Sequence, residues 1–237
     1  MSRASLAIFL IVNTTNVYAQ QPRAPRGIHS YEVGGMYEGE AMQPWLAQAI
    51  VRDTTVDGKA RLAVTYQSRH SAAAGGWLYT YTALIAPSDV ITRWVGNGRA
   101  PFTCQTTHAK NQVVAEIEGR DNATSSILER NAFPDFAVAW VLAGRPLADN
   151  DSIRLTVYRC APAADTVIPL FELDAIVSSG TLARGEGKAP EPVWIVSGAK
   201  SFPYVAQIAK ADRQVLRVRM PQGTVGEMVD VYVASRH

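Results

Sequence analysis

The segment WLYTYTALI, residues 77–85, decides the class of fold. Its side chains alternate with a period of two and are mostly aromatic, β-branched or aliphatic, which is typical of a half-buried strand. One face of this strand carries Trp77, Tyr79 and Tyr81. The other face carries Leu78, Thr80, Thr82 and Leu84. The segment therefore predicts a strand with one aromatic face.

Similar short runs occur along the whole chain. They cover residues 61–67, 90–95, 102–108, 113–118, 153–160, 166–177, 193–197, 203–210, 215–220 and 228–234. Glycine-containing turn segments separate several of them, including residues 96–98, 119–124, 180–187 and 223–226. About ten short strands with a single helix predict a mainly β fold, in which an antiparallel curved sheet forms a partly open β-barrel or a sandwich.

Three segments add detail to this prediction. Residues 44–50 fit a short helix that begins at Pro44, but they run into the turn signal at residues 53–58, so their structure stays open. Pro169 predicts that its strand lies at a sheet edge or is interrupted. Residues 213–220 predict a strand with two different faces. The odd positions carry Val215 and three arginines and predict the solvent face, whereas the even positions predict the core face.

One helix is expected at residues 133–142. Pro134 and Asp135 mark its start, and Gly144 followed by Pro146 marks its end. Its apolar side chains cover nearly the whole surface, so we expect a short helix that is buried against a sheet.

The N-terminus predicts export. Residues 1–19 combine a positive start at Arg3, a short apolar run and small residues near Ala19, as in a cleaved signal peptide, and an uncleaved anchor is the alternative. The apolar run is too short for a transmembrane segment. Residues 20–27 then form a flexible leader and residues 28–237 a single β-rich domain, located in the periplasm or outside the cell.

Composition excludes some partners and favours a disulfide. The 23 Lys and Arg residues nearly balance the 21 Asp and Glu residues, which argues against nucleic acid as a main partner. Cys104 and Cys160 are the only cysteines, and in an oxidising compartment two thiols usually pair, so we expect a Cys104–Cys160 disulfide. Two separate buried thiols are the alternative.

Catalytic motifs are weak, and we expect no cofactor, no metal and no catalytic residue. Ser197 and Lys200 have the Ser-x-x-Lys spacing, but the other motifs of that enzyme class are missing and a turn is the simpler interpretation. Cys104 and His108 share a strand face but lack further metal ligands. Carboxylates on strands, which are Glu116, Glu118, Glu172 and Asp174, are most simply an outward polar face. An enzyme is therefore the less favoured class.

The aromatic face of Trp77, Tyr79 and Tyr81 has two interpretations. It either packs in the sheet core, or it lines a ligand cavity inside the curved sheet. The first functional hypothesis is therefore a non-enzymatic cell-envelope protein that binds or carries an apolar or lipid-like ligand. The second is an envelope interaction or structural module with a solid interior and a protein partner. A hydrolase with residues on separate strands is the third.

The second half of the chain resembles a known family. The order is a short apolar helix, the strands 153–160 and 166–177, the run Pro192-Val193-Trp194-Ile195-Val196, the run Phe202-Pro203-Tyr204-Val205 and the strand 215–220. This order resembles the exported bacterial DUF3108-type proteins over residues 131–235. The resemblance implies an antiparallel β-rich fold in the cell envelope, and it carries over no functional residue.

Overall fold

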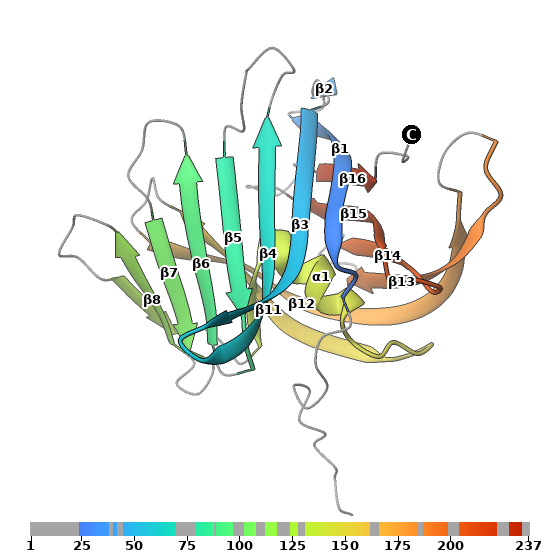
Figure 1. The fold of residues 1–237 in the computed structure, drawn as a ribbon. Helices are drawn as coiled ribbons and strands as arrows, with labels where there is room; N and C mark the ends of the chain where they lie inside the picture. Colours follow the sequence, from blue (N-terminus) through green and yellow to red (C-terminus); the bar gives the residue numbers. More distant parts are fainter. Residues whose placement is uncertain are drawn as a thin grey trace, which may run out of the picture.

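Most residues of the described structure lie in strands of one continuous ladder (Figure 1). The computed structural model describes residues 24–37, 40–41, 45–69, 79–87, 89–96, 102–107, 112–117, 124–127, 131–161, 166–183, 187–198, 204–221 and 228–233. Within these ranges the ladder has 16 strands, and a short helix is the main other element. The predicted mainly β fold with a curved, partly open antiparallel sheet and one short buried helix is confirmed.

The strands of the first half form a meander. They are β1 (Gly27–Tyr37), β2 (Glu40–Ala41), β3 (Trp45–Val56), β4 (Lys59–Arg69), β5 (Tyr79–Ile85), β6 (Asp89–Gly96), β7 (Phe102–Thr107), β8 (Gln112–Ile117) and β9 (Thr124–Ile127). From β3 to β9 each strand pairs antiparallel with the next, whereas β1 pairs with both β2 and β3.

The second half begins with the helical segment and continues as strands. Its elements are β10 (Ala132–Pro134), the 3₁₀ helix η2 (Asp135–Ala137), α1 (Val138–Ala143), β11 (Ser152–Ala161), β12 (Thr166–Leu182), β13 (Glu191–Gly198), β14 (Val205–Ala209), β15 (Val215–Pro221) and β16 (Met228–Val233). β10 pairs parallel with β11, and the pairs from β11 to β16 are antiparallel.

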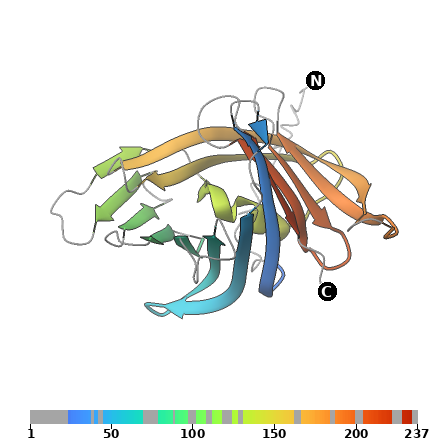
Figure 2. The same ribbon diagram turned by 90° about the horizontal axis from the view of Figure 1, so that it is seen from above.

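The two halves join where β16 pairs antiparallel with β1. The described ladder ends at β9 on one side and β10 on the other, and no described strand pairing joins these two ends. The sheet nevertheless curves far enough for β8 and β9 to approach β12. Figure 2 shows the result, with α1 lying inside the arc between the long strands β11 and β12 and the strands of the first half.

Within residues 44–50, whose sequence also fits a short helix, the described residues 45–50 form a strand. β3 runs on to Val56, so the turn is shorter than the sequence signal at residues 53–58 predicts. Asp57 and Gly58 both have positive φ, 51° and 74°, and Val56 pairs with Lys59. This is the geometry of a two-residue type I′ hairpin, for which Asp-Gly is a favoured sequence.

The helix begins later than expected. Residues 132–134 form β10 because they pair parallel with Thr156–Tyr158 of β11, and helical structure starts at Asp135. Gly144 follows the last helical residue, and its N–H donates to carbonyls of the last turn, as the predicted stop signal requires. The side chains of Val138, Trp140 and Leu142 are buried, which confirms the predicted burial of the helix.

Two positions on β12 test expectations from the sequence, and the first of them, Gly180, differs from the prediction. Gly180 lies within β12 instead of in a turn, and a Cβ built on it would come 2.4 Å from Ile195 Cδ1, so a larger residue there would require the Ile195 side chain to shift. Pro169 lies at a register shift between β11 and β12, and the pairing of β12 with β13 begins only at Ala175. The proline is therefore at a local edge, as predicted.

A register shift in β15 overturns the expected solvent exposure of Val215. Ile208 of β14 pairs with Val215 while Gln207 pairs with Arg217, so Leu216 is the extra residue. Val215 and Val218 are consequently both buried in the main core, and Leu216 packs in a smaller cluster with Val193 and Ala209.

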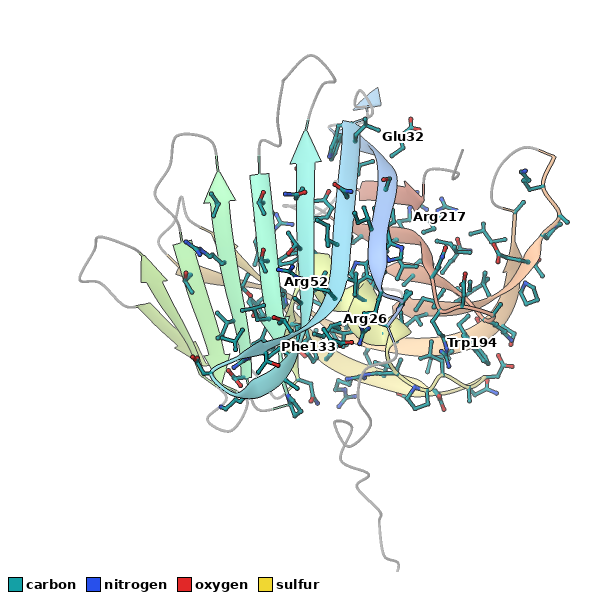
Figure 3. All side chains as sticks on the ribbon, viewed as in Figure 1. Arg26, Glu32, Arg52, Phe133, Trp194 and Arg217 are labelled. Atoms are coloured by element: carbon teal, nitrogen blue, oxygen red, sulfur yellow. The ribbon has the colours of Figure 1, made fainter. Side chains whose placement is uncertain are left out.

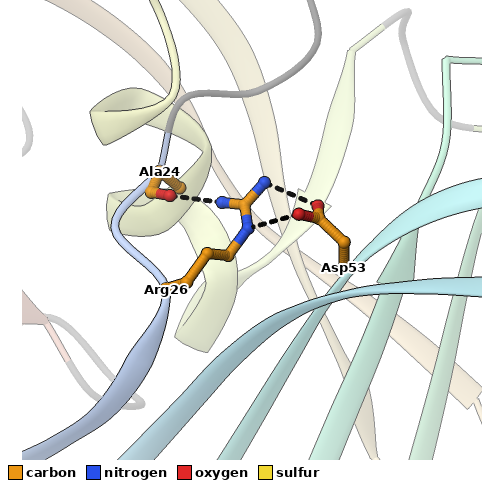
Figure 4. A network of polar contacts seen from close by, with 3 residues as sticks. All are labelled: Ala24, Arg26 and Asp53. Carbon is orange, nitrogen blue, oxygen red and sulfur yellow. Dashed lines mark hydrogen bonds and ion pairs between the residues drawn. The ribbon is translucent and has the colours of Figure 1, made fainter.

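The described end of the predicted leader is tied to the sheet. Ala24 is buried in the core, and Arg26 Nε donates to Asp53 Oδ2 at 2.9 Å while its Nη2 donates to Asp53 Oδ1 at 2.6 Å (Figure 4). Arg26 Nη1 also donates to the Ala24 carbonyl. Residues 20–23 and the predicted signal peptide lie outside the described residues.

Candidate functional site

A cavity of about 150 Å³ lies inside the curved sheet. Its walls come from β1, β3, β4 and β5 on one side, from η2 and α1 on another, and from β11 and β15. The wall is mainly apolar, with one polar end. The helix inside the arc therefore leaves a space between itself and the sheet.

Small side chains on β3 create room between two tyrosines. Tyr31 of β1 pairs with Ala47, and Tyr66 of β4 pairs with Ala49. Paired residues of antiparallel strands share a face, so Tyr31, the two alanines and Tyr66 lie on one face, with the tyrosines in adjacent rows on either side of β3. Larger residues at the alanine positions would fill this space.

The apolar wall is formed by the helical segment and β15. Phe136, Ala139 and Trp140 contribute from η2 and α1, and Val215, Val218 and Met220 contribute from β15. The register shift at Leu216 is what places Val215 on this wall. Phe133, labelled in Figure 3, is fully buried on β10, directly before the helical segment, and fixes its start.

Aromatic rings meet at the end of the cavity near β4 and β5. The ring centroids of Tyr81 and Phe136 lie 5.5 Å apart, and those of Tyr66 and Tyr81 lie 6.4 Å apart. Tyr31, which also lines the cavity, packs edge-on against Trp140 with a centroid distance of 6.2 Å. These separations fall in the range of favourable aromatic pairs, so the tyrosine rings are held in place.

An ion pair forms the charged part of the polar end. Arg159 of β11 donates from Nε and Nη2 to Asp135 Oδ2, at 2.7 Å and 2.5 Å, and Asp135 Oδ1 accepts the backbone N–H of Phe136 at 2.8 Å. The side chain of Arg159 is 30% exposed and that of Asp135 is 10% exposed. The charge of Asp135 raises the pKa of Arg159, and the contact places the guanidinium directly on the carboxylate.

The tyrosines at this end stay protonated. Burial raises the pKa of Tyr31 well above its usual value, and the nearby Tyr66 raises it further. Burial also raises the pKa of Tyr66, opposed by its hydrogen bond with Trp45. The polar end therefore offers neutral hydroxyls beside a compensated ion pair.

Comparison with known proteins finds a structure of similar fold but no similar sequence. No protein-family model matches the chain, and no curated protein is similar in sequence. The crystal structure of a β-barrel-like protein of domain of unknown function DUF1849 from Brucella abortus aligns with a TM-score of 0.52 and 10% identity, covering 89% of this chain and 98% of that chain. The two chains share a fold. At this identity the likeness extends to architecture alone.

The predicted aromatic face falls only partly within the described structure. Tyr81 lies in the cavity wall, beside Tyr66 and Phe136. Tyr79 is the first residue of β5, but its side chain lies outside the described part, and Trp77 lies outside it altogether. A ligand-binding role of these three residues stays a prediction.

The predicted disulfide also stays a prediction. Cys104 lies on β7 and Cys160 on β11, but both side chains are outside the described residues. Among the residues that the structure describes, no group of three or more histidine, cysteine or acidic side chains could hold a metal ion. No described helix is long and apolar enough to cross a membrane.

The acidic candidates on β12 have ordinary partners. Glu172 accepts a hydrogen bond from Thr156 at 2.7 Å, and Asp174 pairs with Arg154 at 3.4 Å on an exposed face. This is the outward polar face that the strand pattern predicts. Ser197 lies on β13, whereas Lys200, Glu118 and the side chain of Glu116 lie outside the described residues.

The sequence analysis missed the ion pair at the cavity. Arg159 follows Ile153, Leu155 and Val157 in the alternation of β11, and those three side chains are buried. A cation in the core-facing set of a strand is a signal for a buried partner or a ligand. Asp135 was interpreted only as the helix start, and its second role depends on the pairing of β10 with β11.

Proposed function

We propose that this chain is an exported, non-enzymatic cell-envelope protein that binds a small apolar or lipid-like ligand inside its curved sheet. The observation that carries the proposal is the cavity of about 150 Å³, which has apolar walls and a polar end. Ligand sites of proteins are typically concave and apolar with a few placed polar groups, and this cavity has that character.

The size of the cavity limits what it holds. An engineered protein cavity of roughly 150 Å³ accommodates benzene, so the space here suits a small molecule or one end of a longer chain. A whole lipid would have to extend beyond the cavity. We therefore propose that the cavity receives the end of an apolar molecule.

The distribution of apolar surface favours this function over a pure interaction module. Among the described residues, the large exposed apolar side chains are Ile28, Leu46, Val95 and Ile176, which lie on four different strands. Single exposed apolar residues are normal on protein surfaces, whereas a docking site requires a contiguous patch. An envelope protein partner remains the alternative that the experiment below tests.

Export and the disulfide belong to the same proposal. The signal sequence of residues 1–19 directs the chain out of the cytoplasm, and the oxidising compartment there supports a Cys104–Cys160 bond. Membership of the DUF3108-type proteins, if established, would place the chain in the cell envelope.

Native mass spectrometry of the protein purified from its own envelope fraction tests these points together. The expected mass is that of a chain beginning at Gln20 and lacking two hydrogens for the disulfide, with an additional species that solvent extraction releases. An A49F variant, whose larger side chain fills the cavity, should carry no such species. A bare chain in both preparations, or an equal load on A49F, would contradict the proposal, and co-purification of a protein instead would favour the interaction module.

A further inference from the structure

The hydroxyl of Tyr31 is buried in the cavity wall and has no hydrogen-bond partner among the residues that the structure describes. The residue is 3% exposed, and no described residue hydrogen-bonds its hydroxyl oxygen. Its ring is fixed against Trp140 and its neighbour across the β1–β3 ladder is Ala47, which has no polar side chain. Buried polar groups in native proteins are almost always satisfied, so this hydroxyl indicates a partner beyond the described residues, and a ligand in the adjoining cavity would supply one.

Tyr66 supplies a second hydroxyl at the same end of the cavity. Its oxygen forms a hydrogen bond with Trp45, and because an indole N–H can only donate, Tyr66 is the acceptor in this bond. The Tyr66 proton is therefore left for another acceptor. Both tyrosines line the same cavity, from the two strands that flank β3, and Tyr66 raises the pKa of Tyr31.

The charge at this end decides between a neutral ligand and an anion. Both bonds from Arg159 go to one oxygen of Asp135, so the guanidinium charge is already compensated. An incoming carboxylate would add an uncompensated negative charge beside Asp135, in a space whose other walls are apolar. Burying an unpaired charge costs far more than burying a hydrogen-bonded neutral group.

From these contacts we infer that the cavity selects apolar ligands that end in a neutral hydrogen-bond acceptor, such as the carbonyl of a ketone, ester or amide, held by Tyr31 and Tyr66. A carbonyl oxygen has two lone pairs and can accept from both hydroxyls, and the attached chain lies along Trp140 and Val218. The inference rests on the proposed function, because it names the ligand class of the same site.

Three probes of similar size separate the contributions of shape, acceptor and charge. They are 2-heptanone, the hydrocarbon 2-methylheptane of the same shape, and the anion heptanoate. Dissociation constants are measured for each at pH 7 by ligand-observed NMR, with the full mature protein. The ketone should bind about tenfold or more tightly than heptanoate, since only heptanoate adds a buried charge.

The Y31F variant tests the acceptor contact directly. It removes one oxygen that no described residue contacts by a hydrogen bond, so the fold should be retained. We expect Y31F to raise the dissociation constant of 2-heptanone by about 3- to 10-fold, the equivalent of one neutral hydrogen bond. The dissociation constant of 2-methylheptane should not change. Y66F should act in the same direction. Tyr204 is equally buried but does not line the cavity, so Y204F is the matched control and should alter neither probe.

The outcomes distinguish this inference from the proposed function. The acceptor contact is wrong if 2-methylheptane and 2-heptanone both bind, but Y31F and Y66F weaken the binding of neither probe more than Y204F does. The apolar cavity then remains the binding site. Tighter binding of heptanoate than of the ketone would also overturn the inference. If none of the three probes binds, the proposed function fails together with it.

Discussion

Two regions of this molecule contain an arginine–aspartate pair, and they differ in what surrounds the guanidinium. Arg61 of β4 contacts Asp89 of β6 at 2.6 Å, with side chains only 3% and 7% exposed, and its Nη1 donates to the Leu84 carbonyl at 3.3 Å. Arg159 pairs with Asp135 at 2.5 Å, but 30% of its side chain is exposed and it borders the cavity. The first pair is buried and joins β4 to β6 across the intervening β5, and the second borders the cavity.

The difference teaches how the same chemical pair can serve structure or binding. A sealed pair cannot be re-solvated when one partner is lost, so its removal should act on stability. A pair beside a cavity can take water or a ligand as a substitute, so its removal should act less on stability and more on which ligand binds. The following predictions test this contrast.

The largest effect is expected for the sealed pair. R61M leaves Asp89 as a buried charge without its cation and should lower the free energy of unfolding by about 3–5 kcal/mol. Chemical denaturation measures the change. The double variant R61M/D89L, which removes both charges, should recover most of this loss, and the remaining folded protein should bind 2-heptanone normally. A loss below 1 kcal/mol for R61M would contradict the assignment of a structural role.

A smaller stability loss and a change in ligand preference are expected for the cavity pair. D135N weakens two charge-assisted hydrogen bonds from Arg159, which is partly solvated, and should cost about 1–2 kcal/mol of unfolding free energy. It also leaves Arg159 as an uncompensated cation, so heptanoate should bind about tenfold more tightly than to the wild type. Unchanged affinity for heptanoate would show that Asp135 does not set the charge preference of the cavity.

Filling the cavity should abolish binding with little change in stability. A49L places a larger side chain in the cavity wall beside Tyr66 and should weaken the binding of 2-heptanone by more than about tenfold, because the space is occupied. Thermal unfolding should shift by only a few degrees, on the order of 1 kcal/mol, since the cavity offers room for the added atoms. Ala60 of β4 is exposed, so A60L is the matched control and should bind normally. Retained binding in A49L would locate the site elsewhere.

The smallest effect is expected for the exposed pair of Arg26 and Asp53. The hydrogen bond from Arg26 lowers the pKa of Asp53, but this carboxylate is 73% exposed. Such pairs contribute about 0–1 kcal/mol. Because the folded pKa is lower than the unfolded one, the contribution is full above the unfolded value near 3.8 and is lost as the pH falls through the folded pKa. D53N should therefore be slightly less stable than wild type at pH 7 and equal to it at pH 2, as measured by urea denaturation.

The local sequence pattern was sufficient to predict most of the fold and one residue of the cavity wall, Tyr81. Period-two alternation located most strands, and the signals at Pro134 and Gly144 located the helix to within two residues. Alternation failed at β15, because the register shift at Leu216 moves Val215 to the core and only the pairing with β14 shows it. The strand β1 was missed because its glycine-rich sequence has no clear pattern, and its pairing with β16 fixes it.

The candidate site depended on contacts between distant segments. Tyr81 was found because it belongs to a visible aromatic stripe. Tyr31 and Tyr66 could not be connected from the sequence, since β3 lies between their strands and its alanines create the space. The pairing of Asp135 with Arg159, 24 residues apart, follows from the parallel contact of β10 with β11, which no local signal predicts.

The most direct test of the central claim is an isotope-filtered NOE spectrum of labelled protein with unlabelled 2-heptanone. If the ligand occupies the cavity, its methyl protons should give cross-peaks to the methyl groups of Ala49, Val218 and Met220, which line the space. Cross-peaks to the exposed side chains of Ile28 or Ile176 instead, or binding without any contact to the cavity wall, would contradict the account.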